Sequence, residues 1–88
     1  MSYRILFDPR AEKELGKLDR RAARRVEQAI HGLKDDPRPQ SARPLVGHEH
    51  LWRLRVGDYR VVYSIKNQEL CILVVRVSHR SGADRGLR

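Results

Sequence analysis

Apolar and polar residues alternate along residues 3–8 (YRILFD), and this period of two predicts a β-strand. The spacing then becomes helical, because the next apolar positions recur at i, i+4 and i+7, namely Ala11, Leu15 and Leu18. Asp8 is suited to cap the free backbone N–H groups of such a helix, and Pro9 is suited to its first position. We therefore expect a short helix that ends near Leu18 or Asp19.

A second helix is predicted over residues 20–36 by four apolar positions with the same spacing, namely Ala22, Val26, Ile30 and Leu33. Asp19 can cap its N-terminus. Its remaining positions include a run of arginines, namely Arg20, Arg21, Arg24 and Arg25. These arginines form either a solvated helix face or an accessory contact for a polyanion. The two helices together are typical of a helical hairpin laid on a sheet.

Residues 35–47 contain three of the four prolines, so we expect a loop there. Three strand patterns follow, over residues 51–56, 59–65 and 70–77. Gly57-Asp58 fits a two-residue hairpin turn between the first two of them. The element order is then β-α-α-β-β-β, an α+β fold with the helical hairpin on one face of an antiparallel sheet. The first strand must join the same sheet, and residues 1–88 form one domain.

The charge balance points to a polyanionic partner, such as nucleic acid, or to an acidic protein. Nineteen Lys and Arg residues against eleven Asp and Glu residues give a net charge of +8, and the excess is mostly arginine, whose planar fork suits phosphate. The lone cysteine, Cys71, excludes an internal disulfide and lies in an apolar run, so we expect it in the core. Without a membrane-length apolar stretch or a signal-peptide pattern, we expect a soluble, cytoplasmic protein.

The predicted hairpin places Arg55 directly opposite Arg60. One face would carry apolar and aromatic core residues, namely Trp52, Leu54, Val56, Tyr59, Val61 and Tyr63. The other face would carry Arg53, Arg55 and Arg60 beside Val62. Like charges directly opposite each other are destabilising, and a bound anion would reverse that effect. The three arginines are therefore either a phosphate-binding face or simply polar residues at exposed strand positions.

Metal chemistry has little support. The sequence GHEH supplies His48 and His50, but zinc needs three or four ligands in a closed geometry. Beyond these two, the further candidate ligands are Glu49, His31 and the lone cysteine. We therefore predict no metal and no cofactor.

The runs PLVG, LWRLRVGDYRVVYSI and LVVRVSHR, in this order on a chain of this length, resemble the RelE/ParE superfamily of toxins from toxin–antitoxin systems. The resemblance covers essentially the whole chain. It implies a microbial RNase-like fold and ribosome-dependent cleavage of mRNA without a metal ion, by attack of the 2′-OH on the adjacent phosphate. It also implies a cognate antitoxin, the ribosome and mRNA as partners, and no membrane or small-molecule cofactor.

The resemblance assigns catalytic roles to Arg53, Arg55 and Arg60, and to Arg80 after the last strand. His79 is the neighbouring residue whose pKa suits proton transfer at neutral pH, although it can equally be a structural histidine at a strand end. Two features depart from the family pattern. Arginines replace the strand lysines, one of which is a proposed general base, and the C-terminal tyrosine that stacks on a nucleobase is absent.

These departures leave two alternatives beside the RNase. One is a ParE-like inhibitor of DNA gyrase that does not cleave RNA. The other is a non-catalytic basic nucleic-acid-binding module. With Trp52, Tyr59 and Tyr63 all on the predicted core face, no stacking platform for free single strands remains, which favours a substrate presented by the ribosome.

Overall fold

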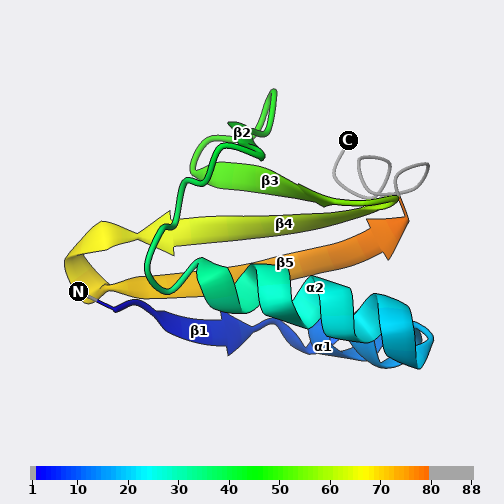
Figure 1. Ribbon diagram of the computed structural model, residues 1–88. Helices are drawn as coiled ribbons and strands as arrows, with labels where there is room; N and C mark the ends of the chain where they lie inside the picture. The colour runs from blue at the N-terminus through cyan, green and yellow to red at the C-terminus, as the bar shows by residue number, and fades with distance from the viewer. Residues whose placement is uncertain (1, 80–88) are drawn as a thin grey trace.

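The computed structural model describes residues 2–79 and has an α+β fold (Figure 1). Its elements follow in the order β1 (Arg4–Phe7), α1 (Pro9–Gly16), α2 (Arg20–Gly32), β2 (Ala42–Pro44), β3 (Leu51–Val56), β4 (Tyr59–Lys66), a 3₁₀ turn (Asn67–Glu69) and β5 (Cys71–His79). The strands form one sheet in the order β1-β5-β4-β3-β2. The predicted fold class is confirmed, with one additional strand.

The first strand joins the sheet beside the last one. β1 pairs with β5 in parallel, from Arg4 opposite Cys71 to Phe7 opposite Val74, and all other strand pairs are antiparallel. The helical hairpin that follows β1 lies on one face of the sheet (Figure 1). Buried residues of both helices and of the central strands share one core, namely Ala11, Val26, Ile30, Leu54, Val61, Tyr63, Val74 and Val77. The opposite face of the sheet is not covered by the two helices (Figure 1).

Both helices begin where the sequence predicts. The side chain of Asp8 accepts a hydrogen bond from the backbone N–H of Arg10 at 2.9 Å, and Asp19 accepts one from Ala22 at 2.8 Å. α2 ends at Gly32, earlier than predicted, and the chain continues in tighter turns with i→i−3 hydrogen bonds up to Asp35. Asp36 precedes Pro37, and the residue before proline disfavours helical geometry. No helix among residues 2–79 has the length and apolar character needed to cross a membrane.

The prediction of an uninterrupted loop over residues 35–47 is wrong. Ala42–Pro44 forms β2, which pairs antiparallel with β3 and places Ala42 opposite Leu54, Arg43 opposite Arg53 and Pro44 opposite Trp52. Proline is tolerated here because β2 is the edge of the sheet, where a missing N–H on the outer side breaks no ladder bond. Ala42 is buried against the core, which holds the short strand in place.

The predicted hairpin register is confirmed at every pair, including Arg55 opposite Arg60. Gly57 has φ +59°, the left-handed conformation that the two-residue turn requires and that glycine adopts without strain. The predicted core face is also confirmed, since Tyr63 is fully buried and Trp52 and Tyr59 pack against the core. Burial raises the pKa of the Tyr63 phenol to about 12, and its hydroxyl donates a 2.8 Å hydrogen bond to the carbonyl of Pro37.

A β-bulge changes which residues of β5 face the core. Tyr63 pairs with Val74 while the preceding residue, Val62, pairs with Arg76, so β5 contains one extra residue. Val77 is therefore in the core, and Arg76 and Ser78 leave the sheet on the side opposite the helices. β5 also continues to His79, two residues beyond the predicted end, and Cys71 at its start is buried as expected.

Candidate functional site

The sheet face opposite the helices has a hollow of about 300 Å³, which we call the arginine hollow. It is lined by Gln40, Ser41, Arg43, Arg53, Arg55 and Arg60. Three of these, Arg53, Arg55 and Arg60, are predicted site residues, and the structure brings them together. The volume is at the lower end of the range for small-ligand sites, and four of the lining residues carry a positive charge.

Strand pairing arranges the four arginines in two rows across the sheet. Arg43 of β2 lies opposite Arg53 of β3, and Arg55 of β3 lies opposite Arg60 of β4. Directly opposed residues have Cβ atoms about 4.5–5.5 Å apart and project from the same face. Each row therefore places two guanidinium groups where both can reach one anion between them.

Arg43 is not among the predicted site residues, because the segment around it is predicted to be a loop. Its Nη1 donates to the carbonyl oxygens of Gln40 at 2.6 Å and Ala42 at 2.8 Å. These bonds to backbone fix the position of the side chain while it stays exposed. One signal was available: Ala42, Arg43 and Pro44 alternate in polarity in the way that an edge strand does, and proline does not exclude an edge strand.

The hollow attracts anions at every physiological pH. Its lining among residues 2–79 includes no carboxylate, and arginine keeps its charge up to pH values far above neutrality. The guanidinium forks supply several N–H donors in planes that match phosphate oxygens. A bound phosphate would also remove the repulsion between the opposed arginines of each row. The arrangement can therefore bind and stabilise a phosphate, but it offers no group there that gains or loses a proton near neutral pH.

His79 is not in the arginine hollow. It pairs with Tyr59, whose side chain is on the helix-covered face, and the two rings contact edge to face with centroids 5.7 Å apart at 81°. The sequence analysis places His79 near the site without assigning it to a face of the sheet, and the structure puts it on the helix-covered face, outside the lining of the hollow. Ser78 is the residue opposite Arg60, and its hydroxyl is buried without a hydrogen-bond partner within the described part of the chain. Arg80 lies outside the described residues.

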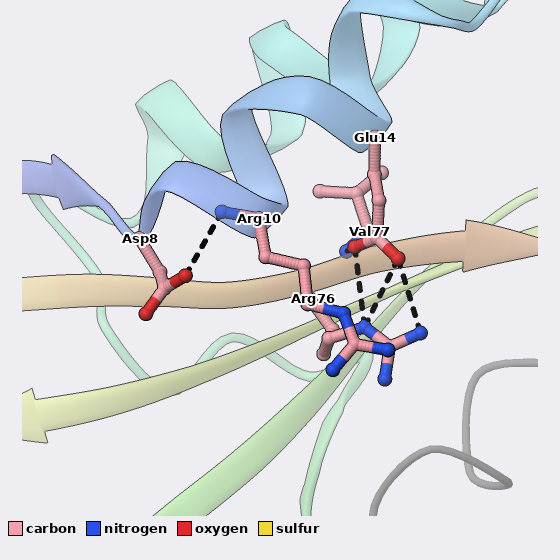
Figure 2. A network of polar contacts seen from close by, with 5 residues as sticks. All are labelled: Asp8, Arg10, Glu14, Arg76 and Val77. Atoms are coloured by element: carbon pink, nitrogen blue, oxygen red, sulfur yellow. Dashed lines mark hydrogen bonds and ion pairs between the residues drawn. The ribbon is translucent and has the colours of Figure 1, made fainter.

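The side chain of Arg76 projects from the same face of the sheet as the hollow. It does not line the hollow but bonds to Glu14 of α1 (Figure 2). Its Nε lies 3.2 and 3.0 Å from the two carboxylate oxygens of Glu14 on α1, and its Nη2 lies 3.0 Å from one of them. The same carboxylate accepts a 2.9 Å hydrogen bond from the backbone N–H of Val77. β1 ends opposite Val74, so Glu14 covers the part of the β5 edge that β1 leaves open. This pair, which we call the edge pair, has a structural role.

The segment His48-Glu49-His50 does not build a metal site. Nε2 of His50 lies 4.0 Å from a carboxylate oxygen of Glu49, and both side chains are largely exposed. Among residues 2–79, no three His, Cys, Asp or Glu side chains are grouped so that they could hold a metal ion.

Comparison with known proteins identifies the family. Residues 5–83 match the family model described as the ParE toxin of type II toxin–antitoxin systems, parDE. The chain belongs to the RelE/ParE family of toxins. A RelE-like toxin protein from Escherichia coli is 31% identical over 86 residues, which cover 96% of this chain and 90% of that protein.

Solved structures of RelE/ParE toxins show the same fold. The RelE–RelB complex from Pyrococcus horikoshii gives a TM-score of 0.80 at 30% identity and covers 94% of this chain and 100% of the matched one. The toxin–antitoxin complex RelBE2 from Mycobacterium tuberculosis gives a TM-score of 0.80 at 28% identity, over 92% and 94% of the two chains. Both of these relatives are seen together with an antitoxin.

Proposed function

We propose that this toxin is a ribosome-dependent mRNA endonuclease and that the arginine hollow binds the scissile phosphate. The observation that carries the proposal is the convergence of Arg43, Arg53, Arg55 and Arg60 on one hollow without a described carboxylate in its lining. Such a site is built for a polyanion, and the sequence relatives of RelE type support RNA as that polyanion. Work on ribosomes would take place in the cytoplasm.

The proposed reaction is attack of an RNA 2′-OH on the adjacent phosphate. The new O–P bond forms as the bond to the 5′-oxygen breaks, which leaves a 2′,3′-cyclic phosphate and a 5′-hydroxyl. Negative charge grows on the phosphoryl oxygens in the transition state. Fixed guanidinium donors stabilise that charge without reorganising, and the loss of one such donor typically costs about 10²–10³-fold in rate.

The proton transfers need a group from outside the hollow. Arginine stays protonated far above neutral pH and is therefore a poor proton acceptor, and His79 lies on the other face of the sheet. We therefore propose that the toxin supplies charge stabilisation and positioning, while the ribosome or bound water accepts the 2′-OH proton and another such group or water donates a proton to the leaving 5′-oxygen. This division of roles explains why such an enzyme would act only on ribosomes.

The proposed protein partner is a cognate antitoxin with an acidic or amphipathic segment. The net charge of +8 favours an acidic partner, and the P. horikoshii and M. tuberculosis relatives are found in complexes with antitoxins. A segment that covers the hollow would occupy the site of the substrate phosphate and block the reaction.

Inhibition of DNA gyrase is the second candidate function. It is favoured by the lack of a described proton-transfer group in the hollow and by the match to a family model described for ParE. In this case the arginines would contact an acidic surface or DNA, and no RNA would be cut.

One experiment separates the two functions. Purified toxin is added to mRNA with and without ribosomes, cleavage is mapped by primer extension, and gyrase supercoiling is measured in parallel. Cleavage that appears only with ribosomes and is lost in Arg55→Ala, but not in the α2 variant Arg24→Ala, supports the RNase. Supercoiling inhibition without cleavage overturns it in favour of gyrase.

A further inference from the structure

We infer that the arginine hollow is a clamp for two consecutive phosphates, one held by the Arg55–Arg60 row and the next by the Arg43–Arg53 row. The ligand class is therefore a single-stranded polynucleotide with at least two neighbouring phosphates, and β2 is the element that provides the second position. This inference rests on the proposed RNA substrate and specifies how that substrate lies.

The geometry of the rows fits two anions better than one. Arg53 and Arg55 are two residues apart on β3, so their rows are separated by about 6.6–6.8 Å along the strand. Within a row the opposed side chains start only about 4.5–5.5 Å apart. This row separation is comparable to the distance between successive phosphates of an extended strand. One phosphate fits between the members of a row, and the next phosphate falls at the other row.

Arg43 is positioned for this role. Its two hydrogen bonds to backbone carbonyls both use Nη1, and no other residue of the range 2–79 bonds to Nε or Nη2, so these donors are left for a ligand in the hollow that Arg43 lines. Gln40 and Ser41 line the same end and add neutral hydrogen-bonding groups beside the second phosphate. An exposed arginine held in place in this way costs less conformational entropy when it binds than a mobile one.

The strand register shows how far the second phosphate position extends across the sheet. The Arg43–Arg53 row continues across the sheet to Val62 and then to Arg76. Val62 is apolar and fully buried, and the charge of Arg76 is compensated by Glu14. The positive surface of this row is therefore confined to β2 and β3, which sets its size at one phosphate.

The test compares ligands that differ by one phosphate. Chemical shifts of isotopically labelled toxin are followed by NMR during titration with non-cleavable 2′-O-methyl RNAs. One ligand is a dinucleotide with a single internal phosphate, and the other is a trinucleotide with two. We expect the trinucleotide to bind at least tenfold more tightly, with a salt dependence steeper by about 0.7 in log–log slope, as one additional phosphate contact on a single strand requires.

The decisive variants are Arg43→Ala and Arg43→Gln, with Arg24→Ala as a control of equal charge loss on α2. We expect both Arg43 variants to bind the trinucleotide no more tightly than the dinucleotide, while their dinucleotide affinity stays within twofold of wild type. The same spectra report whether each variant is folded. An equal loss for both ligands, or an unchanged preference for the trinucleotide, would overturn the clamp.

This experiment is independent of catalysis. A toxin that cleaves mRNA on ribosomes but shows no dependence on Arg43 in the titrations refutes the clamp and leaves the RNase function standing. A toxin that prefers two phosphates through Arg43 but inhibits gyrase and cuts no RNA refutes the RNase and leaves the clamp standing.

Discussion

Arginine side chains project from the same face of the sheet in two regions, the arginine hollow and the edge pair. In the hollow they are arranged to bind a ligand, whereas in the edge pair the arginine is paired within the protein. In the arginine hollow, four arginines converge on about 300 Å³ with no carboxylate among the described lining residues. In the edge pair, Arg76 is 9% exposed, and its guanidinium is held by Glu14 at 3.0 Å. The hollow gathers positive charge at a surface that a ligand can reach, whereas the charge of Arg76 is paired with Glu14 inside the protein.

The difference follows from what each region must do. Like charges directly opposite each other on a strand pair cost stability, and a bound anion offsets that cost. Burying an arginine without a counter-charge lowers the stability of the fold far more, and Arg76 is accordingly buried against the carboxylate of Glu14. Glu14 also satisfies the backbone N–H of Val77 at an open strand edge, which discourages pairing with another chain. Removing an arginine side chain from the hollow should therefore reduce activity, and removing a side chain of the edge pair should reduce stability.

The largest effect on stability is expected from Glu14→Ala. This change leaves the guanidinium of Arg76 buried without its counter-charge and removes the acceptor for the Val77 N–H. We expect the free energy of unfolding to fall by about 3–5 kcal/mol, measured by urea denaturation of toxin purified from its antitoxin. Glu27→Ala, on the exposed side of α2, is the control and should change stability by less than about 0.5 kcal/mol. Equal stabilities for the two variants would show that the edge pair is not structural.

The hollow should show the reverse behaviour. Arg55 is exposed and directly opposes Arg60, so Arg55→Ala opens no cavity and relieves a like-charge contact. We expect stability unchanged or raised, within about 0.5 kcal/mol, and ribosome-dependent cleavage slower by about 10²–10³-fold. Growth arrest on induction and single-turnover cleavage measure the activity. A variant that is fully toxic, or that fails to fold, would place the site elsewhere.

The sequence was sufficient for the hairpin and therefore for most of the hollow. The Gly57-Asp58 turn fixes the register by its length, and register then decides which side chains share a face, so Arg55 opposite Arg60 followed from local chemistry. The helix caps at Asp8 and Asp19 likewise depend only on residues two or three positions further along the chain.

The features that the sequence did not reveal depend on contacts between distant segments. β2 is a three-residue strand whose pairing comes from β3, and an alternation over three residues is too short a signal to separate it from a loop. The bulge opposite Val62 and Tyr63 shifts the alternation of β5, so the face on which His79 lies does not follow from counting residues along the strand. The edge pair joins Glu14 to Arg76 across 62 residues, and no spacing rule predicts it.

A smaller effect on stability is expected at Tyr63, which buries a neutral polar group instead of an ion pair. Tyr63→Phe removes the 2.8 Å hydrogen bond to Pro37 and leaves that carbonyl without its partner, so we expect a loss of about 1 kcal/mol at pH 7. The hollow is not involved, and cleavage should stay within a few-fold of wild type. Denaturation and cleavage assays on the same preparation test both expectations.

The pH dependence of this variant gives a second measurement. Burial raises the pKa of Tyr63 from 10.0 to about 12 in the folded protein, so the unfolded chain loses the phenol proton first as the pH rises. Stability from this group is complete below pH 10 and decreases between about pH 10 and 12. The wild type should therefore lose its advantage over Tyr63→Phe in that range. A stability difference between wild type and Tyr63→Phe that stays constant from pH 8 to 11.5 would mean that folding does not raise the pKa of the phenol.

The smallest effect is expected at His79, and it tests whether the two faces of the sheet are functionally separate. The imidazole contacts Tyr59 on the helix side, so His79→Ala should remove one exposed ring contact and cost at most about 1 kcal/mol of stability. If the arginine face alone performs the chemistry, the pH–rate profile of cleavage keeps the wild-type shape in this variant, since no proton passes through His79. Single-turnover rates from pH 5.5 to 8.5 measure that shape. A neutral-pH limb present in wild type and flattened in His79→Ala would show that the imidazole reaches the substrate, and the separation of the two faces would then fail.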